Sequence, residues 1–302
     1  MQKVGIITVT YNSGNVIDEF IASALHQTHS NLSLYIVDNA SKDDTVERLR
    51  SYRDGRVKII ESATNTGAAD GNNQGIRTAL ADDCDPILLI NNDTVFEADL
   101  LEKLLAGMNG HGCEMIAPKI LFHGQANVIW SAGGDFDRAR GYTSHLYGHG
   151  ECDSGQYDRC RYVENAPTTC LLLKRKVFEQ IGYLDHRYFA YVEDTDFCYR
   201  AKCAGMKLLY FPSAVIWHKA HSLSGGLFSE FMMRYTTRNR VYFMLKHLGL
   251  LRSLYFIPAY QVYLIQQFVF RKIDMSMFWV REKGFLEGLQ VWRESLNDAS
   301  NM

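Results

Sequence analysis

A short run of branched apolar residues at 87–90 (Ile-Leu-Leu-Ile) leads directly into Asn91, Asn92 and Asp93. The apolar run predicts a strand that is buried on both faces, as in a parallel sheet. Ligands of open α/β sheets bind beyond the carboxyl ends of the strands, so oxygen-bearing side chains here suit a metal ion and a phosphorylated ligand. Asn and Asp are also common turn and helix-cap residues, and these three residues alone do not separate the two interpretations.

Strand and helix patterns alternate through the first 95 or so residues. Runs rich in β-branched residues at 4–10, 34–37 and 57–60 predict strands, and helical apolar spacing follows the first two. A Gly- and Asn-rich turn at 65–76 runs into another helix. This alternation predicts βαβ units with right-handed crossovers. We therefore expect an α/β fold with a Rossmann-like, mainly parallel sheet flanked by helices, and a nucleotide-binding half at 1–95.

The remaining sequence divides into a second half of the sheet domain and a helical end. Residues 116–174 have the pattern of short strands and glycine-rich loops, with a returning core strand at 171–173. A helix is predicted at 192–204 and strands at 207–211 and 215–218, and the pattern is helical and aromatic from 228 onward. The expected domains are 1–226, with halves at 1–95 and 96–226, and a C-terminal helical region at 227–302.

Composition and charge describe an ordinary globular protein of 302 residues, 47% hydrophobic and 22% charged. The net charge of −2 does not favour a nucleic-acid binder. The charge is uneven, because residues from 227 onward hold ten Lys/Arg against six Asp/Glu, which gives +4 there and leaves −6 for the rest. The seven cysteines include no C-x-x-C pair, which favours a reducing compartment. With no signal-peptide pattern at the start, we expect a cytoplasmic protein.

Polar residues follow the first two predicted strands as well. Thr8, Tyr11 and Asn12 lie at the end of the first strand, and Asp38 lies at the end of the second. An Asp in that position can accept hydrogen bonds from a base or a ribose, but it can equally form an Asx turn. The segment from 67 to 75 lacks both the G-x-G-x-x-G spacing and a Walker lysine, so a dinucleotide site or a P-loop is not indicated.

Three residues later in the chain could supply acid–base or metal chemistry. Glu193 and Asp194 open a predicted helix, where acidic residues also stabilise the helix dipole. His218 follows a strand and a tryptophan, where a histidine is either a ligand or a structural residue. Asp93 offers the hard oxygen ligand that Mg²⁺ or Mn²⁺ prefers.

Taken together, these motifs resemble those of family 2 glycosyltransferases, inverting enzymes with a glycosyltransferase A fold, and most closely their bacterial rhamnosyltransferase-like branch. The matching segments follow the order and spacing of the family from residue 4 to about 225. They are Thr8–Ser13, Val37–Asp43, Asn65–Gly67 with Gly71–Ile76, Leu89–Thr94, Glu193–Arg200, and Trp217–His218 followed by Ser222.

The resemblance implies roles for residues at each of these segments. The nucleoside of the donor would be held by Thr8, Thr10, Tyr11, Asn12, Asp38 and Asn39, and the rest of the donor site would be lined by Gly67 and Asn72. Residues 91–93 would correspond to the D-x-D motif of the family, with Asn91 in place of its first acidic residue, Asn92 near the ribose and Asp93 on Mg²⁺ or Mn²⁺. His218 would be a further metal ligand. Asp194 would be the catalytic base, with Glu193 as the alternative carboxylate.

The implied reaction is transfer of one sugar, with rhamnose favoured, from a dTDP- or UDP-sugar to a saccharide or lipid-linked saccharide in bacterial cell-surface polysaccharide synthesis. A nicotinamide-dependent oxidoreductase is a different-class alternative, and the missing G-x-G-x-x-G motif counts against it. A non-catalytic nucleotide- or sugar-binding module is another. The joint presence of Asp93, Asp194 and His218 counts against that alternative, because a binder needs no base.

The C-terminal region contains an uncharged stretch of 17 residues at 254–270. This stretch is short for a bilayer span, contains Pro258 and three glutamines, and is followed by Arg271 and Lys272. Three arrangements stay open. The helices could lie on an anionic membrane surface near a lipid-linked acceptor, pack against a second subunit in a homodimer, or simply cover the catalytic domain. Membrane binding would place the protein at the inner face of the cell membrane.

Overall fold

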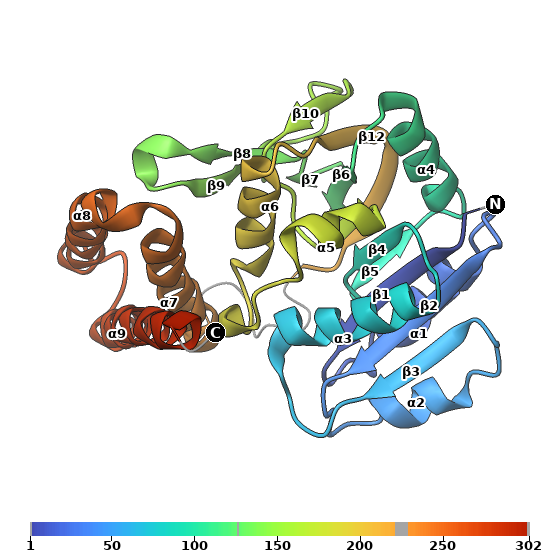
Figure 1. The fold of residues 1–302 in the computed structure, drawn as a ribbon, viewed down its shortest axis with the longest axis horizontal. Coiled ribbons are helices and arrows are strands. Elements are labelled where there is room, and N and C mark those ends of the chain that lie inside the picture. The colour runs from blue at the N-terminus through green and yellow to red at the C-terminus, as the bar shows by residue number, and fades with distance from the viewer. Residues whose placement is uncertain (1, 126, 221–228, 301–302) are drawn as a thin grey trace. The chain divides into compact units, whose positions relative to one another are not determined.

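The computed structural model describes residues 2–125, 127–220 and 229–300 (Figure 1). The chain divides into two compact units. The sheet unit comprises 1–136, 144–189 and 194–223, and the helical unit comprises 137–143, 190–193 and 224–302. The domain boundary predicted at 226/227 lies outside the described residues, as does Ser222.

The sheet unit is built on a ten-stranded mixed sheet, in which eight strands follow the order β10-β12-β6-β11-β4-β1-β2-β3, while β5 pairs with β12 and β7 pairs with β6. The first four strands and the first two helices occur where the sequence predicts them, but the third helix begins at Gly67, inside the segment 65–76 that was predicted as a turn. They are β1 (Val4–Thr10), α1 (Ile17–Leu25), β2 (Leu32–Asp38), α2 (Thr45–Ser51), β3 (Val57–Glu61), α3 (Gly67–Ala81) and β4 (Ile87–Ile90). The pairs β1–β2, β1–β4 and β2–β3 are all parallel, which confirms the Rossmann-like half.

The second half of the sheet mixes strand directions. β11 pairs antiparallel with both β4 and β6, whereas β6 and β12 are parallel. The strands predicted at 207–211 and 215–218 form one strand with a register shift between Phe211 and Val215. The elements of this part of the chain are β5 (Thr94–Phe96), α4 (Leu100–His111), β6 (Met115–Phe122), β7 (Ile129–Ser131), β8 (Gly134–Asp137), β9 (Thr143–Leu146), β10 (Arg161–Val163), β11 (Cys170–Leu173), α5 (Arg175–Ile181), α6 (Glu193–Cys203) and β12 (Leu208–His218). Of these strands, β8 and β9 pair with each other in a separate two-stranded sheet.

Helices cover both faces of the parallel part of the sheet, and each face has its own packing. Ile6, Leu34 and Leu88 share a core cluster with residues of α1 and α4. On the other face α3 approaches β1 closely, because a Cβ at Gly75 would lie 2.5 Å from the Ile7 side chain. A Cβ at Gly71 would lie 2.8 Å from Val9. Two of the glycines in the 67–75 segment are therefore explained by helix–strand packing.

The helical unit contains α7 (Glu230–His247), α8 (Gly249–Val269) and α9 (Met275–Ser300), drawn from orange to red in Figure 1. Val241, Met244 and Leu248 form its small core, against which side chains of α8 and α9 pack. Across the described parts of the chain, α8 included, we find no helix with the length and apolar character of a membrane span.

Candidate active site at the carboxyl ends of β1 and β4

The site lies where the strand order of the sheet reverses. β1 pairs with β2 on one side and with β4 on the other. From β1 the chain adds β2 and β3 toward one edge of the sheet, and it then returns to place β4 on the opposite side of β1. In doubly wound folds this switch point opens a crevice beyond the carboxyl ends of the two strands. Thr10 ends β1, Asp38 ends β2 and residues 91–93 follow β4. Polar residues from three separate parts of the sequence therefore share one edge.

Three buried oxygen atoms at this edge belong to Thr8, Thr10 and Asp38. Thr10 is the register partner of Asp38 across β1 and β2. One carboxylate oxygen of Asp38, Oδ2, accepts a hydrogen bond from the Ser41 backbone N–H at 2.9 Å, as in an Asx turn. The other oxygen, Oδ1, has no hydrogen-bond partner among the described residues, and neither has the Oγ1 atom of Thr8 or Thr10. Since buried polar atoms are nearly always satisfied, these atoms mark a place for a polar ligand.

The turn after β1 is fixed to the loop after β2. The Asn12 N–H donates to Ser41 Oγ at 2.9 Å, and Asn12 Oδ1 accepts from the Lys42 N–H at 2.8 Å. Asn12 itself has a left-handed φ of 52°, which Asn tolerates better than most residues. Its side chain therefore shapes the turn. Tyr11 remains 42% exposed, with a ring free to contact a ligand.

An open pocket of about 420 Å³ adjoins this turn. It is lined by Tyr11, Asn12, Gly14, Asn15, Asp43, Asp44 and Arg48. The carboxylate of Asp43 accepts hydrogen bonds from the Thr45 hydroxyl and from the Gly14 N–H. These hydrogen bonds lower the pKa of Asp43 against the opposing effect of burial, which is the largest single influence.

Asn39 and Gly67 meet through a hydrogen bond. Asn39 Nδ2 donates to the Gly67 carbonyl at 2.9 Å, while its Oδ1 accepts from the Thr66 N–H at 3.1 Å. Gly67 has a φ of 82°, and a Cβ there would lie 2.3 Å from the Phe189 carbonyl oxygen. Only glycine fits at this position. The side chain of Asn39 thus holds the loop that begins α3, and the Asn72 amide donates back to the Ala68 carbonyl at 2.9 Å within that helix.

The segment that follows β4 is held from two sides. Asn92 is buried, and its Nδ2 donates to Ser13 Oγ at 2.9 Å. The N–H of the exposed Asn91 donates to the Thr169 carbonyl at 3.1 Å. Ser13, which was not among the predicted site residues, joins the turn after β1 to the segment after β4. A serine beside a turn glycine gives no signal that separates this role from an ordinary cap.

Asp93 and His218 face each other across the same edge. His218 Nε2 lies 3.2 Å from Asp93 Oδ1, and each side chain is only 9% exposed. Their backbones are joined as well, because His218 pairs in register with Thr94 and the Lys219 N–H donates to the Asp93 carbonyl. The Trp130 ring packs edge-on against the imidazole, with 4.8 Å between ring centroids. The structure thus brings together two predicted metal ligands that are 125 residues apart in the sequence.

This pair suits a divalent ion that shares its coordination with a substrate. Within residues 2–125, 127–220 and 229–300 no three His, Cys, Asp or Glu side chains gather closely enough to hold a metal by themselves. Mg²⁺ and similar ions commonly bind through one or two carboxylates and complete their shell with water and substrate phosphates. One carboxylate and one imidazole at the carboxyl edge of the sheet fit that pattern.

Asp194 lies at the start of α6 and is half-buried, whereas Glu193 beside it is only 7% exposed. The Asp194 carboxylate accepts a hydrogen bond from the Thr195 N–H at 2.6 Å and a further one from the Thr168 backbone. Burial raises the pKa of Asp194 in spite of these hydrogen bonds, which act in the opposite direction. Asp194 therefore combines an accessible surface with a raised pKa, whereas Glu193 is almost fully buried.

A chain of backbone contacts links Asp194 to the segment after β4. The Thr168 N–H approaches the Asp194 carboxylate, and the carbonyl of the next residue, Thr169, accepts from Asn91. Asp194 therefore lies near this edge of the sheet without belonging to the pair formed by Asp93 and His218.

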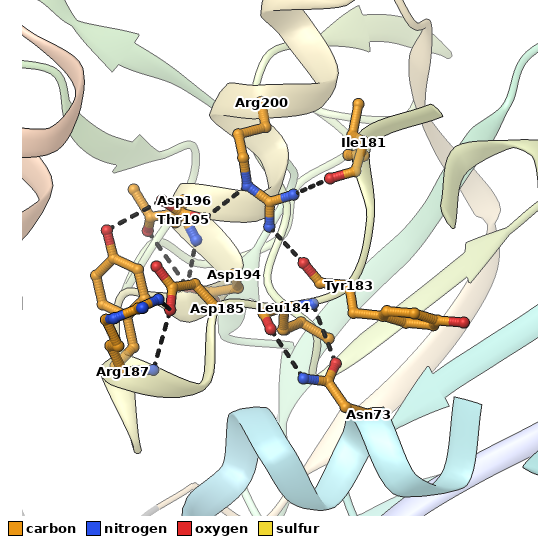
Figure 2. A network of polar contacts seen from close by, with 11 residues as sticks. Asn73, Ile181, Tyr183, Leu184, Asp185, Arg187, Asp194, Thr195, Asp196 and Arg200 are labelled. Atoms are coloured by element: carbon orange, nitrogen blue, oxygen red, sulfur yellow. Dashed lines mark hydrogen bonds and ion pairs between the residues drawn. The ribbon is translucent and has the colours of Figure 1, made fainter. Parts of the chain in front are cut away.

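A polar network holds the start of α6 in place, as Figure 2 shows. The buried Asp196 carboxylate accepts from the Tyr188 hydroxyl at 3.0 Å and from Arg200 Nε at 2.8 Å. The remaining guanidinium nitrogens of Arg200 donate to the Ile181 and Tyr183 carbonyls. Because all the polar atoms of this acid are used within the protein, Asp196 is structural.

Asn73 joins the two halves of the sheet unit and was not predicted to do so. Its amide donates to the Leu184 carbonyl at 2.8 Å and accepts from the Leu184 N–H at 3.0 Å, and the paired bonds are visible in Figure 2. Asn73 is almost fully buried in α3. An asparagine inside a helix that faces the core is the only signal in the sequence for such a contact.

These features define an α/β protein with a polar edge at its switch point, a carboxylate–imidazole pair and a separate carboxylate with a raised pKa. Comparison with known families gives the class. The family model "Glycosyl transferase family 2" matches residues 5–182, and the chain belongs to this family. This membership decides against a nicotinamide-dependent oxidoreductase.

Among curated relatives, the low-salt glycan biosynthesis hexosyltransferase Agl10 of Haloferax volcanii is 28% identical over 205 residues, which are 67% of this chain and 62% of that protein. The N-acetylglucosaminyl-diphospho-decaprenol L-rhamnosyltransferase of Mycobacterium tuberculosis is 28% identical over 244 residues, which are 72% of this chain and 76% of that protein. The chain thus spans less than two thirds of the haloarchaeal relative.

Solved structures share the fold. The mannosyltransferase PcManGT of Pyrobaculum calidifontis, solved with GDP-Man and Mn²⁺, has a TM-score of 0.57 at 15% identity, over 82% of this chain and 64% of that chain. GalNAc-T7, solved with UDP, GalNAc and Mn²⁺, has a TM-score of 0.60 at 14% identity, over 80% of this chain and 47% of that chain. These likenesses confirm the glycosyltransferase A fold expected from the sequence.

Proposed function

We propose that this protein is an inverting glycosyltransferase that moves one sugar, with rhamnose favoured, from a dTDP- or UDP-sugar to a saccharide or lipid-linked saccharide. The observation that carries the proposal is the 3.2 Å pairing of Asp93 and His218 at the switch point of a family 2 fold. The mycobacterial relative, whose name describes rhamnosyl transfer to a diphospho-decaprenol-linked sugar, supports the choice of sugar and acceptor. Synthesis of bacterial cell-surface polysaccharide is the corresponding role.

The donor nucleoside binds at the edge formed by β1 and β2. Asp38 Oδ1, which has no partner within the described residues, accepts a hydrogen bond from the base or the ribose, and Thr10 lies directly beside it. The ring of Tyr11 packs on the base. Asn12 and Asn39 support the nucleoside site indirectly, because their side chains hold the turn and the loop that surround the nucleoside. Asn92, whose side chain donates to Ser13, would lie near the ribose.

Asp93 and His218 would hold Mg²⁺ or Mn²⁺, and such an ion, when bound, neutralises charge on the leaving nucleoside diphosphate. The two side chains are already in contact and largely shielded from water, which strengthens their electrostatic effect on a diphosphate. Asn91, in the first position of the triplet, is exposed and uses its backbone to fix the segment.

Asp194 acts as the base. Its carboxylate removes the proton from the acceptor hydroxyl as that oxygen attacks the anomeric carbon, and the diphosphate leaves on the opposite side, which inverts the configuration. Burial favours this role, because a raised pKa makes the ionised carboxylate a stronger proton acceptor. One carboxylate suffices, whereas a glycoside hydrolase generally needs two carboxyl groups that flank the bond.

The same proposal includes the domain division and the location expected from the sequence. Residues 1–226 form the catalytic domain, with a nucleotide-binding half at 1–95 and an acceptor half at 96–226, and the helical region follows at 227–302. The protein works in the cytoplasm, where nucleotide sugars are its donors.

The proposal can be tested with a nucleotide screen followed by product analysis. Thermal unfolding is measured with dTDP, UDP, GDP and NAD, each with and without Mn²⁺, and the stabilising nucleotide selects the donor sugars for a transfer assay. We expect stabilisation by dTDP or UDP that Mn²⁺ strengthens, and a product with inverted anomeric configuration by NMR. Stabilisation without any transfer to saccharide or lipid-linked acceptors would support a binding module. A product with retained configuration would contradict the mechanism.

A further inference from the structure

Large apolar side chains are exposed mainly in the helical unit. Sixteen such side chains are exposed among the described residues, and twelve of them lie between 251 and 296. Exposed apolar residues scattered singly are normal, but a concentration of them on one element marks a surface that binds something. The concentration begins on α8, where Leu251 is 85% exposed.

Most of the exposed apolar side chains of α8 lie on one side of the helix, which we call the outer face, and the exposed Leu254 and Tyr263 lie at its margins. It is defined by Leu251, Tyr255, Val262, Ile265 and Val269, whose spacings of four, seven, three and four place them on one side. The opposite side contains the buried Ser253 and Leu264 and packs against the small core around Met244. α8 is therefore apolar on both sides, and packing within the protein accounts for only one of them.

The outer face continues into the turn between α8 and α9. Phe270, Met275 and Trp279 are all more than half exposed around this turn. An open hollow of about 490 Å³ lies here, lined by Phe268, Val269, Arg271, Lys272, Ile273 and Asp274. The ring of Phe268, one of the lining residues, packs against the ring of Phe278 with 5.1 Å between the ring centroids, which gives the turn an apolar base.

The charges around this surface are mostly positive. Residues 249–275 contain three basic side chains, those of Arg252, Arg271 and Lys272, and one acidic side chain, that of Asp274. The Asp274 carboxylate accepts a hydrogen bond from the Met277 N–H and so caps the start of α9. The negative charge of Asp274 therefore lies at the N-terminus of α9, where it interacts with the helix dipole. The turn consequently presents two adjacent cations beside exposed aromatic and aliphatic side chains.

We propose that the outer face of α8 and the turn at 270–275 bind the surface of an anionic lipid bilayer. A helix that lies in the interface inserts an apolar face among the acyl chains while basic residues contact anionic headgroups. Tyr and Trp, of the kind found here at 255, 263 and 279, are enriched at that depth of a membrane. The proposal rests on this surface alone and does not depend on the transfer reaction.

A second copy of the chain fits the surface less well. The exposed residues of α8 from Leu254 to Tyr263 spread over roughly half of the helix circumference at 3.6 residues per turn, wider than the seam of a helix pair. A two-fold dimer would also place this patch against itself. Arg271 and Lys272 would then find no acidic partner in the patch except the capping Asp274.

The test is vesicle flotation of the full chain without donor or acceptor. Vesicles of phosphatidylcholine alone are compared with vesicles that also contain phosphatidylglycerol, at low and high salt. We expect binding to the anionic vesicles that salt weakens. Replacement of Lys272 by Gln, or of Arg271 by Gly, should weaken binding about fivefold for each charge lost. Arg271→Gly is suited to this purpose because Arg271 has a left-handed φ of 53°, which glycine adopts freely.

Charged substitutions on the outer face of α8 test whether this surface, and no other part of the protein, binds the vesicles. The double variant Val262→Glu with Val269→Glu should abolish flotation, and Tyr162→Glu, on an equally exposed residue of the sheet unit, should float like the parent. All variants are checked by thermal unfolding. Absence of flotation in the parent, or flotation that the double variant retains, would overturn the proposal. So would light scattering that shows a parental dimer dissociated by the double variant, together with no binding to vesicles.

Discussion

The switch-point edge of the sheet and the outer face of α8 depart from normal burial in opposite directions. At the edge, polar atoms of Thr10, Asp38 and His218 are buried, whereas on α8 large apolar side chains such as Leu251 and Val269 are exposed. A buried polar group and an exposed apolar patch are the two informative exceptions in a folded protein. This contrast supports the two proposals, in which the edge binds a polar, charged ligand and the outer face of α8 binds an anionic membrane surface.

The largest expected effect is on the transfer rate and comes from a substitution near the switch-point edge of the sheet. Asp194→Asn should lower the transfer rate by about 10²- to 10⁴-fold, because the base is lost while the shape of the site is kept. Nucleotide binding, measured by thermal stabilisation, should stay close to that of the parent. The matched control is Glu193→Gln, which should retain much more activity. A parental rate in Asp194→Asn, or a larger loss in Glu193→Gln, would mean that Asp194 is not the base.

The next largest effect concerns the free energy of unfolding, when Leu is replaced by Ala at one buried and one exposed position. Leu88→Ala removes a fully buried side chain from β4 and should lower the free energy of unfolding by about 2–5 kcal/mol. Denaturant unfolding followed by circular dichroism measures it. The same substitution at the exposed Leu254 of α8, Leu254→Ala, should have a much smaller effect. If both cost the same, Leu254 would be part of a core and not of an exposed face.

A pH-dependent effect connects the edge with stability. Because burial raises the pKa of Asp194 in the folded protein, the folded state holds the proton more tightly than the unfolded chain does. The parent should therefore lose stability as the pH rises from the ordinary Asp pKa of about 3.9 toward the raised value. Asp194→Asn has no such proton, so its Tm should exceed that of the parent at neutral pH, and the difference should vanish in acid. A Tm below that of the parent at neutral pH would argue against a destabilised, ionised base.

The smallest effect is expected on α8. Leu254→Ala and Val262→Ser should each change the free energy of unfolding by no more than about 0.5 kcal/mol, because both side chains are more than half exposed. Flotation with anionic vesicles should nevertheless weaken. A loss of several kcal/mol in unfolding experiments would show that these side chains are covered in solution, for instance by another subunit.

The parts of the fold that could be predicted from the sequence are those whose pattern lies within one short segment. The strand runs at 4–10, 34–37, 57–60 and 87–90 are clear in the sequence, so the Rossmann-like half was predicted correctly. The segment 65–76 was predicted as a turn, whereas α3 already begins at Gly67, because packing against β1 outweighs the low helix propensity of Gly and Asn. The position of β11 between β4 and β6 was not predicted, because antiparallel insertion depends on pairing between distant segments. The single strand β12 was predicted in two pieces, since the irregularity around Pro212 interrupts the pattern.

The candidate site shows the same limit. Asp38, Asp93 and His218 could be identified because each follows a strand, where a ligand site is expected. Ser13 and Asn73 could not, because a serine in a turn and an asparagine in a helix have many ordinary explanations. Their importance appears only through partners that are 79 and 111 residues away in the chain. The choice between Glu193 and Asp194 likewise required burial, which two adjacent carboxylates do not reveal in sequence.

The most direct test of the central claim is calorimetric titration of dTDP and UDP into the parent and into Asp93→Ala, with and without Mn²⁺. The account predicts that Mn²⁺ tightens binding of one nucleotide to the parent and to Asp194→Asn, and that this enhancement is absent in Asp93→Ala and in His218→Ala. An equal Mn²⁺ enhancement in Asp93→Ala and in the parent would contradict the account, because the diphosphate and its metal would then be held elsewhere.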